Sequence, residues 1–241
     1  MNDMNKLWGT LDRSNEDKRV AQASAAILKD VYLWMTSALV ISGLTAMLVA
    51  GNPTLINTIF SSKFGFIAII LAQLGLVMLI SSRINKLSVL TATVLFILYA
   101  ALTGVTLSSI FLVFTQESIT SVFFITAGTF AVVSAFGYIT KKDLSSLGNI
   151  LFMGLIGIII ASVVNWFLHS EMLYWIVSYV GVLIFVGLTA YDTQKIKQMA
   201  IEYSDGNFEI TQKVALIGAL SLYLDFINLF LHLLRIFGKR D

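Results

Sequence analysis

The sequence has no cysteine, one proline and only two histidines among its 241 residues. Without cysteine, disulfides, thiol catalysis and thiolate metal sites are excluded. Two histidines, His169 and His232, are too few for a multi-histidine metal site. Charged residues are scarce as well, at 12% of the chain, which is about half their share in ordinary soluble domains. No cofactor is expected from this inventory.

What fills the chain instead is apolar sequence, at 57% of all residues. A soluble protein of this length needs more polar surface to cover its core. The few charges cluster between long apolar runs, as expected if those runs lie in a lipid bilayer. The net charge of +2 is too small to indicate a nucleic-acid partner. We therefore expect an integral membrane protein.

The apolar runs predict an all-α membrane protein of seven transmembrane helices, since a span needs roughly 20 mainly apolar residues. Residues 1–28 are read as a polar N-terminal tail without a cleavable signal peptide, and residues 29–241 as the transmembrane domain. Pro53 is expected in the first loop, so no span carries a proline kink. The predicted spans are residues 31–50, 64–82, 87–114, 119–139, 148–168, 172–197 and 212–236.

The basic residues predict the orientation, because they gather on the cytoplasmic side of membrane proteins. The N-terminal tail and the loops after the second, fourth and sixth spans carry twelve of the sixteen. A cytoplasmic N-terminus follows. Seven crossings then place the C-terminus outside, where Arg235, Lys239 and Arg240 oppose the rule. An incomplete last crossing would return it to the cytoplasm, and both arrangements stay open.

Two of the fourteen carboxylates fall within predicted spans: Asp192 near the inner end of the sixth and Asp225 in the middle of the seventh. A charged residue at mid-membrane costs at least ~2.5 kcal/mol, so it should face an interior or an aqueous cavity. An acid at a span's cytoplasmic end is often simply solvated, and Asp192 has Lys195 one turn on. Asp225 is the stronger candidate for function.

The seventh span carries a polar stripe around Asp225. Its members are spaced 4, 3, 4 and 3 residues apart, which places them on one helical face. Such a stripe on an apolar helix should point inward, so the last span is expected at the centre of the bundle. Polar contacts between helices would explain it as well, but a mid-membrane aspartate favours function. The predicted pore-lining members, besides Asp225, are Ser221, Asn228, His232 and Arg235.

If Asp192 and Asp225 face each other, the two carboxyl groups would share a proton. Such a pair is suited to a pH-responsive latch, and its ionised form offers oxygen ligands to a hard cation such as Ca²⁺. Arg83, at the inner end of the second span, is a candidate counter-charge. An anchor on the positive-inside side would account for it equally well.

Three segments resemble the Bax inhibitor-1 family, also called the transmembrane Bax inhibitor motif family. Residues 187–196 (GLTAYDTQKI) are similar to its sixth-span signature, and residues 219–230 (ALSLYLDFINLF) to the seventh-span signature of its bacterial members. Residues 82–86 (SRINK) are also typical of bacterial relatives. The resemblance covers the chain from about residue 25 to its end.

The resemblance implies six helices around a central seventh and a pH-sensitive calcium leak gated by an aspartate pair. The matching positions are Asp192 and Asp225, which would also be the contacts for Ca²⁺. In the family, a second-span arginine latches to the sixth-span aspartate, and Arg83 occupies that position. Some relatives have an acidic residue near Gln73, where this chain has a neutral amide. A bacterial inner-membrane location is implied too.

Two further classes of function compete with a leak channel. Certain bacterial relatives modulate a membrane-bound AAA protease, and the N-terminal tail would then dock the partner. Intramembrane aspartyl proteases also place aspartates in their sixth and seventh spans. Here, however, Asp225 follows Leu-Tyr-Leu rather than Gly-x-Gly, and no Pro-Ala-Leu segment follows. A non-enzymatic membrane protein is therefore expected.

Overall fold

A computed structural model describes residues 2–60, 63–204 and 207–240 and is helical almost throughout these ranges. Seven of the described helices are long and apolar enough to cross a membrane, so the prediction of an all-α, seven-span membrane protein is confirmed. The elements are α1 (Asn2–Ala50), α2 (Pro53–Phe60), α3 (Lys63–Arg83), η1 (Ile84–Lys86), α4 (Val89–Leu107), η2 (Ser108–Leu112), α5 (Gln116–Ile139), α6 (Ser145–Leu168), α7 (Glu171–Glu202) and α8 (Phe208–Phe237).

Two details differ from the predicted spans. The first loop contains the short helix α2, which Pro53 begins; Asn52 caps it by accepting hydrogen bonds from the backbone N–H groups of Thr54 and Leu55 at 3.1 and 3.2 Å. Proline is well suited to the first turn of a helix, whose N–H groups have no intrahelical partner. The second difference is α1, which continues without a break through the boundary predicted at residue 28.

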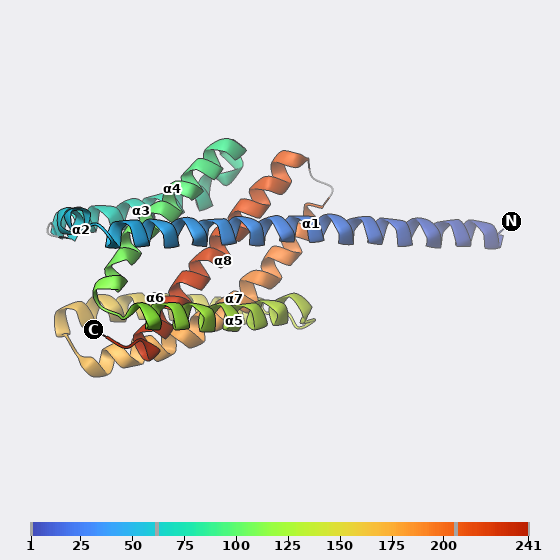
Figure 1. Cartoon of the computed structure of the whole chain (residues 1–241). Helices are drawn as coiled ribbons and strands as arrows, with labels where there is room; N and C mark the ends of the chain where they lie inside the picture. The colour runs from blue at the N-terminus through green and yellow to red at the C-terminus, as the bar shows by residue number, and fades with distance from the viewer. Residues whose placement is uncertain (1, 61–62, 205–206, 241) are drawn as a thin grey trace.

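Helix α8 lies at the centre of the bundle, as predicted (Figure 1). In its most apolar stretch 72% of the residues are buried, against 6% in α3 and 11% in α6. α8 packs directly on α1, α4, α5 and α7, whereas α3 packs mainly on α4 and α6 on α7. α3 and α6 therefore form an outer layer, and most of their side chains face the lipid.

Glycines allow the inner helices to approach closely. At Gly104 of α4, an added Cβ would lie 2.5 Å from the carbonyl oxygen of Ser42 on α1. At Gly137 of α5, it would lie 2.3 Å from the carbonyl oxygen of Ala190 on α7. Small residues at such crossings are characteristic of membrane helix packing, because association there depends on close van der Waals contact.

The two ends of the chain lie at opposite ends of the bundle (Figure 1). α8 is long and apolar enough to cross a membrane, and the tail beyond it is bound at the far end of the bundle. There the backbone N–H of Thr115 donates to the carbonyl of Lys239 at 3.0 Å, and the N–H of Lys239 donates to the Ser118 hydroxyl at 3.0 Å. Of the two arrangements considered from the sequence, this geometry supports the full seventh crossing. We call the end that holds the N-terminus the inner end and the other the outer end.

Candidate functional site in the α7–α8 interface

The two intramembrane aspartates meet between α7 and α8. Asp225 is buried, with 4% of its surface exposed, and Asp192 is half-buried. Their carboxyl groups are close enough to interact with each other. Because two ionised carboxylates can only accept hydrogen bonds, a hydrogen bond between them would require a proton on one of them. The cation that acts on the Asp192 carboxyl is Lys195, which lies one turn farther along α7 and is exposed.

Asp225 also has a polar atom without a partner. Its Oδ2 is buried and, with both carboxyl groups ionised, has no hydrogen-bond partner among the described residues. An unsatisfied buried acceptor of this kind costs about 1–3 kcal/mol, so native structures hold few of them. The position is therefore costly for stability, and this cost marks the pair as the candidate site.

The rest of the polar stripe of α8 lies along α7 toward the outer end. His232 is buried, and its ring stacks on that of Phe185 with centroids 5.6 Å apart. Gly181 makes room for it, because an added Cβ there would lie 2.4 Å from the imidazole Cε1. The imidazole Nδ1 has no hydrogen-bond partner among the described residues. Beyond it, the Arg235 guanidinium lies 5.9 Å from the centre of the Tyr174 ring.

Two cavities open at the outer end of this stripe. One of about 180 Å³ is lined by Val177, Tyr174 and Arg235, among others. A larger one, of about 610 Å³, also includes Arg240, whose guanidinium donates to the Tyr174 hydroxyl at 2.9 Å. The outward-facing arginines thus pack around one aromatic ring. The stacked rings of His232 and Phe185 lie between these cavities and the aspartate pair.

Two members of the stripe are less buried than Asp225 and His232. Asn228 is half-buried and donates its amide to the Leu224 carbonyl at 2.8 Å, within its own helix. Ser221 is also half-buried. Their role as pore-lining residues stays a prediction. The geometry places the stripe along the α7–α8 contact, with its buried members Asp225 and His232 at the positions nearest α7.

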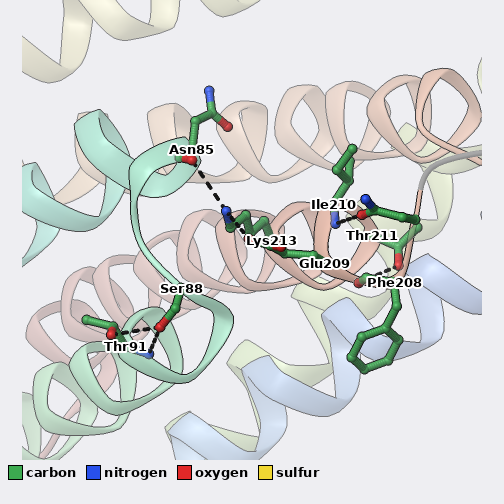
Figure 2. Close-up of polar contacts among 9 residues, drawn as sticks. Asn85, Ser88, Thr91, Phe208, Glu209, Ile210, Thr211 and Lys213 are labelled. Atoms are coloured by element: carbon green, nitrogen blue, oxygen red, sulfur yellow. Dashed lines mark hydrogen bonds and ion pairs between the residues drawn. The ribbon is translucent and has the colours of Figure 1, made fainter.

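Arg83 ends α3 and is exposed, and it is not among the charges that act on Asp192. Its latch role stays a prediction. The connection that follows α3 is instead held by Lys213 of α8, which donates to the Asn85 carbonyl at 3.4 Å and pairs with Glu209 at 2.8 Å. Figure 2 shows this contact at the inner end, where the start of α8 meets the turn between α3 and α4.

Gln73 is not at the aspartate pair. Gln73 lies on α3, and its side-chain amide donates to the hydroxyls of Thr106 and Thr103 on α4 at 3.2 and 3.5 Å. This bond joins two helices, which is the ordinary use of a polar side chain inside a membrane protein.

Two contacts that fix α7 beside the pair are not indicated by any sequence pattern. Gln194 accepts from the Leu144 backbone N–H and donates to the Lys142 carbonyl, both at 2.9 Å. Lys197 donates to the Tyr138 carbonyl at 2.8 Å. Both lie within two turns of Asp192, and Gln194 belongs to the quoted sixth-span segment. They clamp the inner half of α7 to α5 and to the loop after it.

A metal held permanently at the pair is poorly supported by this geometry. Ca²⁺ takes six to eight oxygen ligands, and the described residues contain no cluster of three or more acidic or histidine side chains. Asp192 and Asp225 would supply two carboxyl groups at most. A cation would therefore be expected to contact them in passing rather than to reside there.

Comparisons with known proteins agree with this architecture. A model of the family described as inhibitor of apoptosis-promoting Bax1 matches residues 24–241. Inner membrane protein YbhL of Escherichia coli K12 is 49% identical over 233 residues, covering 95% of this chain and 100% of the relative. A Borreliella burgdorferi protein is 49% identical over 225 residues (93% and 97%). Protein RP147 of Rickettsia prowazekii is 41% identical over 231 residues (96% and 97%).

Proposed function

Because the chain belongs to the Bax inhibitor-1 family, we propose that it is a pH-sensitive calcium leak channel of a bacterial inner membrane. The observation that carries the proposal is the contact of the Asp192 and Asp225 carboxyl groups inside the α7–α8 interface. The pair gates the route and has no catalytic role. The inner-membrane location follows the relative YbhL.

In this proposal, a proton shared by the two carboxyl groups holds α7 and α8 together and keeps the route shut. Loss of that proton leaves two like charges at close range, which repel each other. The repulsion separates the inner halves of the helices, and the ionised carboxylates attract a cation. Flux is therefore expected to rise as the pH rises through the range in which the shared proton is lost.

The charged and titratable groups facing this region are few. Lys195 of α7 acts on Asp192, and on α8 the next titratable groups toward the outer end are His232 and Arg235. The described conformation has the carboxyl groups in contact while Arg83 is exposed. In the proposed cycle it therefore corresponds to a paired but unlatched state, and the latch would close in a separate step.

The test is calcium influx into liposomes that contain the purified full-length protein, measured from pH 6 to pH 8. The wild type should show influx that increases with pH, and Asp225→Asn should lose that dependence. Asp143→Asn is the matched control, because it makes the same chemical change at an exposed loop carboxylate. If Asp225→Asn keeps the wild-type rate and pH profile, the proposal is wrong.

The second candidate function is a membrane-embedded modulator that binds an AAA protease and transports nothing. The observation in its favour is the inner part of α1, which extends as a helix well beyond the bundle (Figure 1). Such an extension offers a partner a docking segment outside the membrane. Deleting residues 2–17 should then abolish capture of the protease, and liposomes that contain the intact protein should show no calcium influx. Capture that survives the deletion, or calcium influx through the intact protein, would contradict this assignment.

A further inference from the structure

A groove of about 710 Å³ runs between α1 and α5 on the side of the bundle. α1 packs on α4, α7 and α8, and α5 packs on α7 and α8, so a furrow stays between them. Its floor includes Phe226 of α8, next to Asp225 in the chain. Three alanines at intervals of four, Ala127, Ala131 and Ala135, form one wall and leave the furrow open.

The groove is long and parallel to the spans. On α1 its lining begins at Ala25 and ends at Leu39, a separation of 14 residues, or about 21 Å at 1.5 Å per residue. One leaflet supplies about half of the ~30 Å hydrocarbon thickness. The groove therefore has the length of one lipid tail together with part of its headgroup region, and its volume lies within the range of ligand pockets.

Its polar groups are gathered toward the inner end. The Tyr32 hydroxyl reaches across from α1 to lie 2.6 Å from the Ser134 hydroxyl of α5, and the pair belongs to the groove lining. Nearer the inner end the lining includes Lys29 and Tyr138. The ammonium of Lys197 lies 4.6 Å from the centre of the Tyr138 ring, so two lysines flank this end of the groove.

Neither lysine is neutralised by an acidic partner in the described part of the chain, although Lys197 also donates to the Tyr138 carbonyl at 2.8 Å. Lys29 is exposed, and no carboxylate of the described residues lies within ion-pair distance of it or of Lys197. Basic pockets between transmembrane helices on the cytoplasmic side recognise anionic lipid headgroups. The inner end is also the side that the basic residues of the sequence assign to the cytoplasm.

We propose that this groove is a binding site for one anionic glycerophospholipid of the inner leaflet. An acyl chain lies along the alanine wall and over Phe226, and the phosphate is bound by Lys29 with Lys197 beside it. The site does not depend on cation flux, since it would exist equally in a protein that only binds a partner.

The test uses full-length protein in detergent and counts bound lipids by native mass spectrometry. Phosphatidylglycerol and phosphatidylethanolamine with identical acyl chains are compared as probes. The wild type should retain phosphatidylglycerol preferentially. Lys29→Gln should weaken that preference by about fivefold, the effect expected of one lysine near an anionic headgroup. Lys141→Gln is the control, because it removes an exposed lysine in the loop after α5.

A second variant tests the acyl part of the site. Ala131 is exposed, so Ala131→Trp should fold normally and fill the groove, which would reduce retention of both lipids. Glycerophosphoglycerol, the headgroup without chains, should not compete, whereas competition would mean that a free phosphate compound is the ligand. Equal retention of the two lipids by the wild type, or unchanged retention in Ala131→Trp, would overturn the proposal.

Discussion

Helix α8 carries two buried polar clusters only two residues apart, and they differ in how completely they are satisfied. The Tyr223 hydroxyl lies 2.6 Å from that of Ser42 on α1, and Ser42 donates to the Ala100 carbonyl of α4 at 2.7 Å. Ser42 also lies 2.9 Å from the Ala38 carbonyl of its own helix, so its one proton has two carbonyl acceptors and the Tyr223 hydroxyl can donate to Ser42. Every hydroxyl proton of this cluster has an acceptor, and the cluster joins three helices.

The aspartate cluster on the other side of α8 is not fully hydrogen-bonded. Asp225 Oδ2 has no donor among the described residues, and its contact with Asp192 depends on a proton that the solvent can remove. Complete hydrogen bonding is what a structural cluster requires. The comparison therefore separates a buried polar cluster with complete hydrogen bonding, at Tyr223, from an incomplete one at Asp225, which is where the proposed function places a change of state.

The strongest test of this comparison is a double-mutant cycle on the pair. Asp192→Asn and Asp225→Asn should each change calcium flux at pH 7 by about tenfold, and the double variant should differ little from either single one, because residues of one network are not additive. Liposome flux assays at fixed protein content provide the measurement. Fully additive effects would mean that the two carboxyl groups act separately.

The next largest effect is expected at His232, whose imidazole Nδ1 also has no hydrogen-bond partner among the described residues. Gly181→Ala places a methyl group against the imidazole and should destabilise the protein by about 1–3 kcal/mol, the usual cost of overpacking. Thermal unfolding in detergent measures it. Gly157→Ala is the control, because nothing lies within 4 Å of a Cβ added there. Equal melting temperatures for the two variants would show that His232 is free to move.

Tyr223→Phe should have a smaller effect, restricted to stability. It removes one interhelical hydrogen bond, which is worth about 0.6–1.7 kcal/mol within a membrane protein. The pH profile of calcium flux should remain that of the wild type. A variant that melts normally but loses the pH dependence of flux would place Tyr223 in the gate and end the distinction between the two clusters.

The smallest effect is expected at Asp143, in the loop after α5. Hydrogen bonds from Ser145, first from its side chain and second from its backbone N–H at 2.9 Å, lower the pKa of this exposed carboxyl below its ordinary value of 3.8. Its stabilising contribution is therefore present above that ordinary value and is lost as the pH falls through the lowered pKa. Thermal unfolding should show that Asp143→Ala lowers the melting temperature slightly at pH 7 and by less as the pH falls below 3.8, with no effect on flux from pH 6 to pH 8.

Much of the fold could be predicted from the sequence because each span has a strong local signal. Length and hydropathy are sufficient to identify helices such as α6, and the 4-3-4-3 spacing around Asp225 is sufficient to predict a central α8. The extent of α1 could not be predicted, because its polar inner part has no apolar run. Nor could α2, which lies in a loop of ordinary length.

The candidate site was predictable only in part. Depth in the membrane identifies Asp225, and the family resemblance supplies Asp192 as its partner. The contact between His232 and Gly181, by contrast, joins residues 51 positions apart and depends on the packing of α7 on α8. The same is true of Gln194 and the loop after α5, since a glutamine in a helix does not indicate which distant carbonyl it will reach.

The attachment of α7 to α5 has a consequence for how the gate can move. Gln194 and Lys197 bind three backbone groups outside their own helix, and Gly137 brings the α5 backbone against Ala190. These contacts hold α7, which carries Asp192, in place on the side away from the pair. In the proposed gate, opening would then be a displacement of α8, whose inner end is held by Lys213 on the turn between α3 and α4 and by Gln212, which donates to the Asp30 carboxylate of α1 at 3.1 Å.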